Sequence, residues 1–168
     1  MFDGKEEKVV QSLNSRFKNG ELFPFLPTKE KWFIGRGKKV KEKGLLFPGY
    51  VFIETALAGR DFLSLTRQFI DSSSDIIRLL KNSDSDDDFA IKESERTAWL
   101  YLLGKEKCVE ASVGFMEDDK IYIEYGSLKG LEGIIKKINR HKREATIETQ
   151  FMGRLQKIDV ALQIIKKV

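Results

Sequence analysis

The sequence is poor in the residues that build covalent and metal-bound frameworks. It has one cysteine, one histidine and three prolines in 168 residues. Cys108 cannot form an internal disulfide, and with His141 it offers too few ligands for a zinc site. No apolar run approaches the roughly 20 residues that cross a bilayer, and the start lacks signal-peptide character. We therefore expect a cytoplasmic protein in a reducing compartment, with no membrane partner, metal or other cofactor.

Motifs for catalysis are lacking as well. No glycine-rich loop of the P-loop or dinucleotide type is present, and Gly35-Arg36-Gly37 is too short to count. The acidic run at 82–88 lacks the glycine and the downstream glutamate of a calcium loop, so a solvated loop is the favoured interpretation. A nucleophilic pair of Cys108 and His141 is left open, but no motif supports it. We predict that the protein is not an enzyme.

Apolar residues and basic charge are well represented. Apolar residues make up 41% of the chain, which suits a protein with packed cores, and the net charge is +4. The window 126–157 holds 8 basic residues against 3 acidic ones. Such a patch attracts phosphate backbones, although a solvated face is the commoner reason for a charge cluster. Charge alone therefore leaves nucleic acid as one candidate partner.

The first hundred residues predict a mixture of helices and strands. Asp3 and Glu6 form a capping-box pattern, and Gly20 follows as a stop for a first helix. Between them Val9, Leu13 and Phe17 recur every four residues as one apolar stripe. Two strand-like runs then flank a hairpin tip at 35–39, and Pro48-Gly49 interrupts the second run. Together with two further helices and a short strand, the pattern indicates an α+β fold with an antiparallel sheet; the expected strands are 23–34, 43–54 and 76–80, and the expected later helices are 60–71 and 93–103.

The pattern changes after Gly104. Residues 105–114 are charged and without periodicity, so we expect a linker there. Short strands separated by turns follow, which favours a small closed β-barrel; they are expected near 121–125, 133–138, 145–151 and 155–160. The sequence therefore predicts two domains, 1–104 and 115–168, joined by the linker.

Two stretches resemble the NusG family of transcription elongation factors. Leu46-Phe47-Pro48-Gly49-Tyr50-Val51-Phe52 resembles the hallmark of the NusG N-terminal domain, and Gly126 to Gly133 with the following strand resembles a KOW motif. The pair, in this order, covers about 3–166. The resemblance implies a NusG N-terminal-type antiparallel sheet with flanking helices and a C-terminal SH3-like β-barrel (KOW). It also implies a monomer that binds RNA polymerase.

A finer resemblance concerns the segment Lys136-Lys137-Ile138-Asn139-Arg140-His141-Lys142-Arg143. With Phe151-Met152-Gly153 downstream, it is similar to the LoaP subgroup, antiterminators that recognise an RNA hairpin. Family members usually begin with a Trp-Tyr-x-Leu strand, whereas this sequence opens at Met1-Phe2-Asp3-Gly4. We therefore expect that first strand to be missing, either through a start codon placed too late, through shortening of the chain, or as a genuine variant with a weakened sheet.

The resemblance also assigns candidate sites. The N-terminal domain of the family docks an apolar surface on the clamp helices of the polymerase, and the matching residues here are Phe47, Pro48, Gly49 and Tyr50. We expect Phe47 to be an interface residue. Interface and core are equally favoured for Tyr50, and Phe52 and Ile53 are expected in the core.

The second candidate site is the basic segment of the barrel. Cationic side chains on a turn suit RNA phosphates, and arginine can also bind a guanine edge. Because Lys136 and Lys137 are adjacent in a strand, at most one should join any single surface. The predicted RNA-binding residues are Lys129, Lys137, Arg140, His141, Lys142, Arg143 and Arg154, with Lys129 and Arg154 as outer members.

Two alternatives stay open at this point. In the first, the chain is a general elongation or pausing factor whose barrel binds a ribosomal protein or a termination factor, with Phe151 and its neighbours as the contact. In the second, it is a ribosome-associated KOW protein, against which the Phe-Pro-Gly-Tyr segment argues. The sequence does not identify a target operon or an RNA motif.

Overall fold

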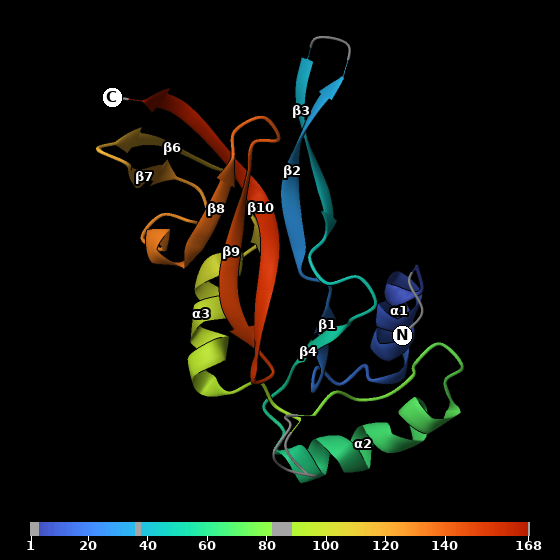
Figure 1. The fold of residues 1–168 in the computed structure, drawn as a ribbon. Helices are drawn as coiled ribbons and strands as arrows, with labels where there is room; N and C mark the ends of the chain where they lie inside the picture. The colour runs from blue at the N-terminus through green and yellow to red at the C-terminus, as the bar shows by residue number, and fades with distance from the viewer. Residues whose placement is uncertain (1–3, 36–37, 82–88, 168) are drawn as a thin grey trace. The chain divides into compact units, whose positions relative to one another are not determined.

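The computed structural model describes residues 4–35, 38–81 and 89–167, and its fold is mixed α+β (Figure 1). The chain divides into two compact units. The first contains 1–26 and 47–92, and the second contains 27–46 and 93–168. This division differs from the predicted boundary at 105–114 because segment 27–46 pairs with a strand from the C-terminal part.

The first unit contains two helices and a two-stranded sheet. Helix α1 spans Glu6–Arg16 and buries Val9 and Leu13, two members of the predicted apolar stripe. Helix α2 spans Gly59–Ser72, close to the predicted 60–71, and buries Phe62. Strands β1 (Phe23–Phe25) and β4 (Phe52–Glu54) pair antiparallel. The third member of the predicted stripe, Phe17, is the C-cap residue that follows α1, and its ring meets that of Phe69 in α2 edge to face at 5.8 Å.

Prolines divide the two long predicted strands. The first run splits into β1 and β2 (Thr28–Gly35), with Pro27 between them. The second run splits into β3 (Lys38–Leu45) and β4, with Pro48 between them. Because proline has no N–H to donate to a ladder, the runs are interrupted at Pro27 and at Pro48, whereas Pro24 lies within the three-residue strand β1. One predicted long hairpin thus becomes two short ladders, one in each unit.

Some expectations for the first hundred residues are corrected. Residues 76–80 form no strand, and the N-cap of α1 is Lys5, without a side-chain capping bond. Asp3, the hairpin tip at 36–37 and the acidic run at 82–88 lie outside the described residues. The first predicted helix ends at Arg16, before Gly20.

The second unit begins with a three-stranded sheet. Strands β2 and β3 pair antiparallel along their whole length, and β5 (Cys108–Val109) pairs parallel with the first two residues of β2. Helix α3 spans Glu93–Leu103, with the predicted bounds. The predicted linker is therefore wrong as an unstructured segment, because 105–114 contains β5 and the start of the next strand.

A five-stranded sheet makes up most of the second unit. Its order is β7-β6-β10-β9-β8, and the ladders between the described residues leave β7 and β8 as its edges. The long strand β10 is antiparallel to β9 in its first half and parallel to β6 in its second half. The remaining elements are β6 (Ser112–Glu117), β7 (Lys120–Tyr125), the 3-10 helix η1 (Glu132–Ile134), β8 (Ile135–Asn139), β9 (Glu144–Phe151) and β10 (Arg154–Lys167).

The KOW-like segment serves the packing of this sheet. Leu128 is fully buried, and its N–H donates to the buried Ser112 Oγ at 3.0 Å. Gly126 has a φ of +99°, and a Cβ there would lie 2.5 Å from the Cα of Ser112. Only glycine combines this conformation with so close an approach. The first glycine of the motif is therefore required by the fold.

Candidate functional surfaces

The Phe47-Pro48-Gly49-Tyr50 segment forms a tight turn in the first unit. The N–H of Tyr50 donates to the carbonyl oxygen of Phe47 at 3.2 Å, and Gly49 has a φ of +83°. Proline at the first central position and glycine with positive φ at the second are the requirements of a type II turn. The sequence therefore sets the geometry of this segment locally.

A buried carboxylate holds this turn from outside. Glu6, at the start of α1, is 2% exposed, and its Oε1 accepts the N–H of Gly49 at 2.7 Å. This hydrogen bond, followed by the N–H of Glu6 itself, holds the pKa of the Glu6 carboxyl below its usual 4.5. Sequence reasoning placed Glu6 in a local capping box and missed this role, because its partner is 43 residues away.

A pH dependence follows from the Glu6 contact. Because the folded pKa of Glu6 is depressed, its contribution to stability is complete above the unfolded pKa and is lost as the pH falls through the folded pKa. We expect the first unit to lose stability as the pH falls below about 4.5, and Glu6→Gln to reduce that loss. Urea denaturation of both proteins between pH 3 and pH 6 measures this. Identical pH profiles for the two would contradict the assignment.

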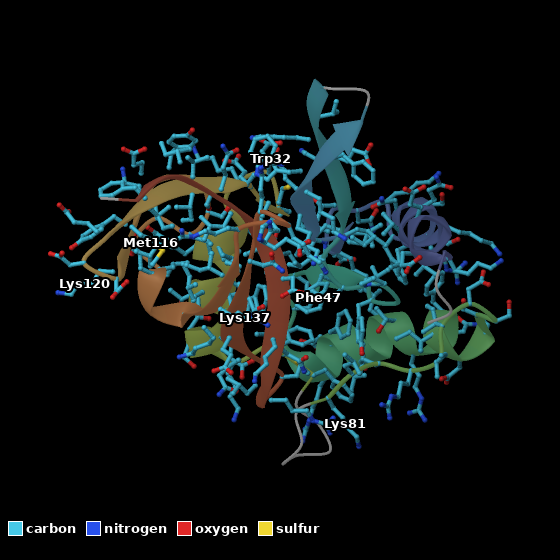
Figure 2. The ribbon with its side chains drawn as sticks, turned by 45° about the horizontal axis from the view of Figure 1, so that its top comes forward. Trp32, Phe47, Lys81, Met116, Lys120 and Lys137 are labelled. Atoms are coloured by element: carbon cyan, nitrogen blue, oxygen red, sulfur yellow. The ribbon has the colours of Figure 1, made fainter. Side chains whose placement is uncertain are left out.

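Aromatic rings surround the turn. The ring of Phe47 lies 5.6 Å from that of Phe52 and 6.4 Å from that of Tyr50 (Phe47 is labelled in Figure 2). Phe47 is half-buried, Pro48 is exposed and Tyr50 is 41% exposed. Such edge and tilted contacts between rings fix their orientation. Tyr50 and Pro48 therefore present more surface than Phe47, for which the sequence favoured the interface.

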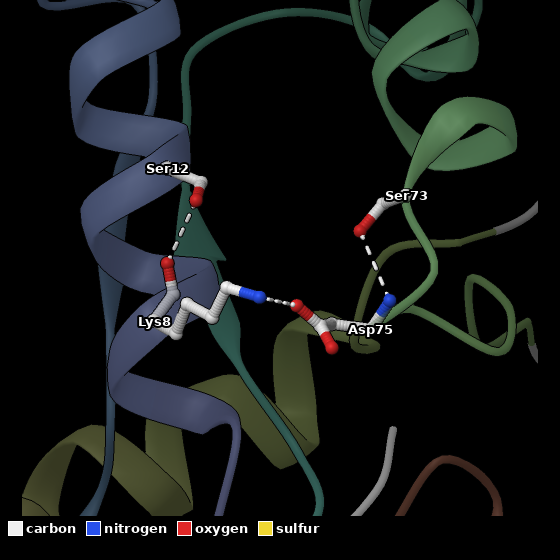
Figure 3. Close-up of polar contacts among 4 residues, drawn as sticks. All are labelled: Lys8, Ser12, Ser73 and Asp75. Carbon is white, nitrogen blue, oxygen red and sulfur yellow. Dashed lines mark hydrogen bonds and ion pairs between the residues drawn. The ribbon is translucent and has the colours of Figure 1, made fainter.

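A polar contact ties α1 to the segment after α2 (Figure 3). Lys8 Nζ lies 2.6 Å from Asp75 Oδ2, and this pairing lowers the pKa of Asp75. The N–H of Asp75 also donates to Ser73 Oγ at 3.4 Å. Because Lys8 is well exposed, the ion pair contributes little to stability. This contact orients the segment that leads into 76–80, where the sequence predicts a strand and the structure has none.

The basic turn, residues 139–143, joins β8 to β9 in the second unit. Asn139 Oδ1 accepts the N–H of Lys142 at 3.0 Å, and the N–H of Arg143 donates to the carbonyl oxygen of Arg140 at 3.3 Å. Arg143 has a φ of +54°. The side chains of Arg140, His141 and Lys142 are exposed, and that of Arg143 is half-buried. The turn thus presents a run of cationic groups to solvent.

Two neighbours modify this turn. Arg140 Nη2 donates to Met116 Sδ of β6 at 2.9 Å, which orients the guanidinium (Figure 2 labels Met116 and Lys137). Strand β8 has an irregularity between Ile135 and Lys137, so Lys136 has no opposite residue on β9. Both lysines are exposed, and Lys136 lies 4.0 Å from Glu148. Of these two lysines, Lys136 is therefore the one beside an acidic residue, and Lys137, two residues before the turn, is the better candidate for a contact with phosphate.

The outer members of the predicted RNA-binding set lie elsewhere. Arg154 follows the far end of β9, an eight-residue strand, so it lies about 25 Å from the basic turn. Lys129 is exposed in the loop after β7, and its carbonyl oxygen accepts the hydroxyl of Tyr101 at 3.0 Å. The structure therefore groups five of the seven predicted residues, Lys137, Arg140, His141, Lys142 and Arg143, and separates Arg154 from them.

Helix α3 closes over the β9–β10 turn and covers Phe151. Phe151 is 8% exposed, and Trp99 meets its ring edge to face at 6.1 Å. Trp99 Nε1 also donates to the carbonyl oxygen of Gln150 at 2.8 Å. The buried Glu95 carboxylate accepts the N–H groups of Met152 and Gly153, both at 2.9 Å. In this arrangement Phe151 packs inside the unit and does not form an open contact surface.

Other kinds of site find no support in the part of the chain that the structure describes. Within 4–35, 38–81 and 89–167, no group of three acidic, histidine or cysteine side chains is placed to hold a metal ion. No helix in these ranges is long and apolar enough to cross a membrane. Cys108 is buried in β5, whereas His141 is exposed on the basic turn.

The structure is that of a mixed α+β protein with an aromatic turn on one unit and a basic turn on the other. Comparison with known proteins identifies its family. The family model described as "Transcription termination factor nusG" matches residues 1–99, more than half of the chain. The chain therefore belongs to the NusG family.

Two curated relatives agree with this assignment. The transcription termination/antitermination protein NusG of Thermus thermophilus is 25% identical over 171 residues, covering 97% of this chain and 93% of that protein. The protein of the same description from Borreliella burgdorferi is 24% identical over 138 residues, covering 80% of this chain and 74% of that protein. These are similarities at low identity, and they support a transcription factor of the termination/antitermination type.

Proposed function

We propose that this chain is an operon-specific antitermination factor that binds RNA polymerase and recognises a nascent RNA hairpin. In this proposal the C-terminal strands act as a KOW-type barrel, and the basic turn contacts the RNA. The protein works as a cytoplasmic monomer without a cofactor, as in the LoaP subgroup that the basic segment resembles. The observation that carries the proposal is the exposed run Arg140, His141 and Lys142 on one ordered turn.

The aromatic turn is the proposed contact with the polymerase clamp helices. Its backbone is fixed by Pro48-Gly49 and by the Glu6 carboxylate, so little conformational entropy is lost when a partner binds. An exposed tyrosine beside a proline supplies apolar area and a hydroxyl, a combination frequent at interface hot spots. Tyr50 is therefore the proposed anchor. Pro48 is exposed in the same turn, and the ring of Phe47 packs against the ring of Tyr50.

The basic turn is the proposed contact with RNA. Paired RNA offers mainly phosphates and 2′-hydroxyls, whereas a hairpin loop exposes base edges to arginine. Contact between the Arg140 guanidinium and Met116 limits the directions in which Arg140 can point. A restrained arginine next to flexible lysines suits recognition of one RNA feature within a general attraction to phosphate. Lys137 and Arg143 extend the same surface.

The test compares a structured leader RNA with a scrambled RNA of equal length. We expect Arg140→Glu/Lys142→Glu to weaken binding of the structured RNA by at least about tenfold and to lower the salt dependence, since two phosphate contacts are removed. Fluorescence anisotropy at several salt concentrations measures both quantities. Equal affinity of the unaltered protein for the two RNAs would remove the hairpin-specific part of the proposal.

A matched control is Arg154, the first residue of β10, which pairs with Phe151 at the far end of β9. Arg154→Glu makes the same charge change per residue at the other end of β9. We expect it to change RNA affinity much less than Arg140→Glu alone, because it lies far from the basic turn. A readthrough assay with polymerase and a terminator template then connects RNA binding to antitermination. Readthrough that persists after the double charge reversal would favour the general-factor alternative.

A further inference from the structure

The β6–β7 hairpin combines exposed aromatic rings with negative charge. Residues 115–125 contain one lysine and four acidic residues, a net charge of 1 − 4 = −3 in a protein whose net charge is +4. Figure 2 labels the single lysine, Lys120, which follows the turn between the two strands. The acidic side chains are all exposed, and within the described part of the chain none of them forms an ion pair; they are Glu117, Asp118, Asp119 and Glu124.

A β-bulge places two tyrosines on the same side of this hairpin. Phe115 pairs with Tyr122 and Val113 pairs with Tyr125, with a shift of register at Gly114. Because Val113 and Phe115 share one face of β6, their partners share that face too, although the two tyrosines are three residues apart. A Cβ at Gly114 would collide with the carbonyl oxygen of Tyr122, so the close approach at the bulge requires glycine. Tyr122 is 43% exposed and Tyr125 is 58% exposed.

The Tyr122 ring has one face available to a partner. Its centroid lies 5.3 Å from that of Phe115, and the two ring planes differ by 16°, so the rings are stacked. Since the two residues are cross-strand neighbours, the stack runs across the strands, and the second face of the Tyr122 ring is directed beyond β7. Strand β7 is an edge of the five-stranded sheet, so no strand of the described chain covers that ring face. Glu124, the extra residue of the bulge, is exposed two positions further along β7.

Stability of the hairpin explains only part of this composition. A stacked cross-strand pair stabilises the two strands that carry it, which accounts for Phe115 and Tyr122. It does not account for Tyr125, whose ring is the more exposed and has no ring partner or side-chain hydrogen bond within the described residues. It does not account for the carboxylates at 117–119 either, because consecutive like charges repel one another. Exposed rings beside unpaired carboxylates are instead suited to binding a cation.

We propose that this acidic aromatic face, formed by Phe115, Tyr122 and Tyr125 with Glu117 and Glu124, binds an arginine-rich segment of a basic protein. A planar guanidinium stacks on a tyrosine ring and pairs with a carboxylate through two parallel hydrogen bonds. A lysine ammonium offers neither the planar stack nor the paired hydrogen bonds. Nucleic-acid bases also stack on exposed rings, but the carboxylates around these rings repel phosphates. The sign of the charge therefore selects a cationic peptide.

The proposed site is separate from the basic turn and from Phe151. Met116, which contacts Arg140 of the basic turn, follows Phe115 in β6, so its side chain points to the opposite face of the hairpin. Phe151 is 8% exposed and packs against Trp99 of α3. The basic turn and the acidic aromatic face can therefore act on partners of opposite charge.

The test measures binding of labelled peptides to the full chain by fluorescence anisotropy. One peptide alternates arginine with serine, and the other alternates lysine with serine at the same length and charge. We expect the arginine peptide to bind at least about fivefold more tightly than the lysine peptide. Tyr122→Ser is expected to abolish this preference, whereas Tyr122→Phe, which keeps the ring, is expected to retain it. Equal affinity of the unaltered protein for the two peptides, or an unchanged preference in Tyr122→Ser, overturns the proposal.

Charge variants test the same face with all its rings in place. Glu117→Gln/Glu124→Gln is expected to weaken binding of both peptides about fivefold, since two exposed ion pairs are lost. Glu7→Gln/Glu106→Gln, at exposed carboxylates outside the face, makes the same charge change and is expected to have much less effect. Thermal unfolding checks that each variant is folded, and the charge pair decides the question if Tyr122→Ser does not fold. Equal effects of the two charge pairs overturn the proposal.

Two other occupants are distinguished by the same variants. Binding of a single-stranded oligonucleotide that is lost in Tyr122→Ser identifies the face as a base-stacking surface and overturns the proposal. Self-association in sedimentation experiments that is lost in Tyr122→Ser identifies a second copy of the chain as the occupant, with the same consequence. The RNA test of the basic turn rests on Arg140 and Lys142, so none of these outcomes decides it.

Discussion

Replacing Glu95 with alanine is expected to lower the free energy of unfolding of the second unit by about 3 kcal/mol. Its carboxylate is 7% exposed and accepts two backbone N–H groups, from Met152 and Gly153, each at 2.9 Å. Alanine removes the charged acceptor from the half-buried N–H of Met152 and from the exposed Gly153. Because a hydrogen bond to a charged group contributes about 1.5–3 kcal/mol, two such bonds that are partly open to water account for about 3 kcal/mol together. Urea denaturation followed by tryptophan fluorescence measures the loss, since Trp99 lies one helical turn from Glu95.

Two further replacements separate the hydrogen bonds from the helix. Glu93→Ala removes an exposed carboxylate of the same helix that lies 3.0 Å from Arg96, and its effect is expected to stay within about 0.5 kcal/mol. Glu95→Gln keeps the shape but only one accepting oxygen, and is expected to lie between the two. Hydrogen exchange should accelerate at the amides of Met152 and Gly153 in Glu95→Ala. Unchanged exchange there would show that the carboxylate does not hold the β9–β10 turn.

The elements predicted best are those whose signals are local. Helix α3 has the predicted bounds because polar residues precede it and Gly104, with a φ of +60°, ends it. The Phe47–Tyr50 turn can be predicted from the sequence equally well, since proline fixes its own φ and glycine permits the positive φ that the turn requires. The segment 76–80 shows the opposite case. Its apolar residues favour a strand, but a strand also requires a neighbour to pair with, which the pattern does not supply.

Contacts between distant residues were missed for the same reason. Glu6 and Gly49 are 43 residues apart, and Glu95 and Gly153 are 58 apart. A carboxylate near the start of a helix is interpreted as a capping residue when only its neighbours in the sequence are considered. Segment 27–46 was assigned to the first domain because of its position in the chain, yet β2 pairs with β5. The pairing partners of short strands depend on the whole fold, so they cannot be predicted from the composition of each segment.

Counting charges along the sequence located the basic turn but overestimated its extent. Arg154 belongs to the same basic window as Arg140, although the strand between them places it about 25 Å away. The β2–β3 hairpin shows the converse. Its two strands hold six lysines on either side of the segment 36–37, and the register of β2 and β3 brings the two groups beside each other. Local charge density therefore has to be judged along the strand direction, where each residue adds about 3.4 Å.

Replacing Tyr50 with serine is expected to weaken binding to RNA polymerase about 30-fold, which corresponds to about 2 kcal/mol for the loss of one interface anchor. Tyr50 is 41% exposed, and its backbone is held by the turn, so removal of the ring should take away contact area with little change in fold. Phe47 is a less suitable site, because its ring also packs on Phe52. Biolayer interferometry with immobilised core polymerase measures the affinity.

The control for Tyr50 is an aromatic ring with similar exposure on the other unit. Tyr125, at the end of β7, is 58% exposed, and Tyr125→Ser removes an equal amount of side chain. We expect this variant to bind the polymerase as well as the unaltered protein does. If both variants lose affinity equally, general apolar attraction explains the binding and the aromatic turn is not its site. If only Tyr50→Ser loses affinity while its thermal unfolding is unchanged, the interface lies at the Phe-Pro-Gly-Tyr turn, because that comparison removes folding as the cause.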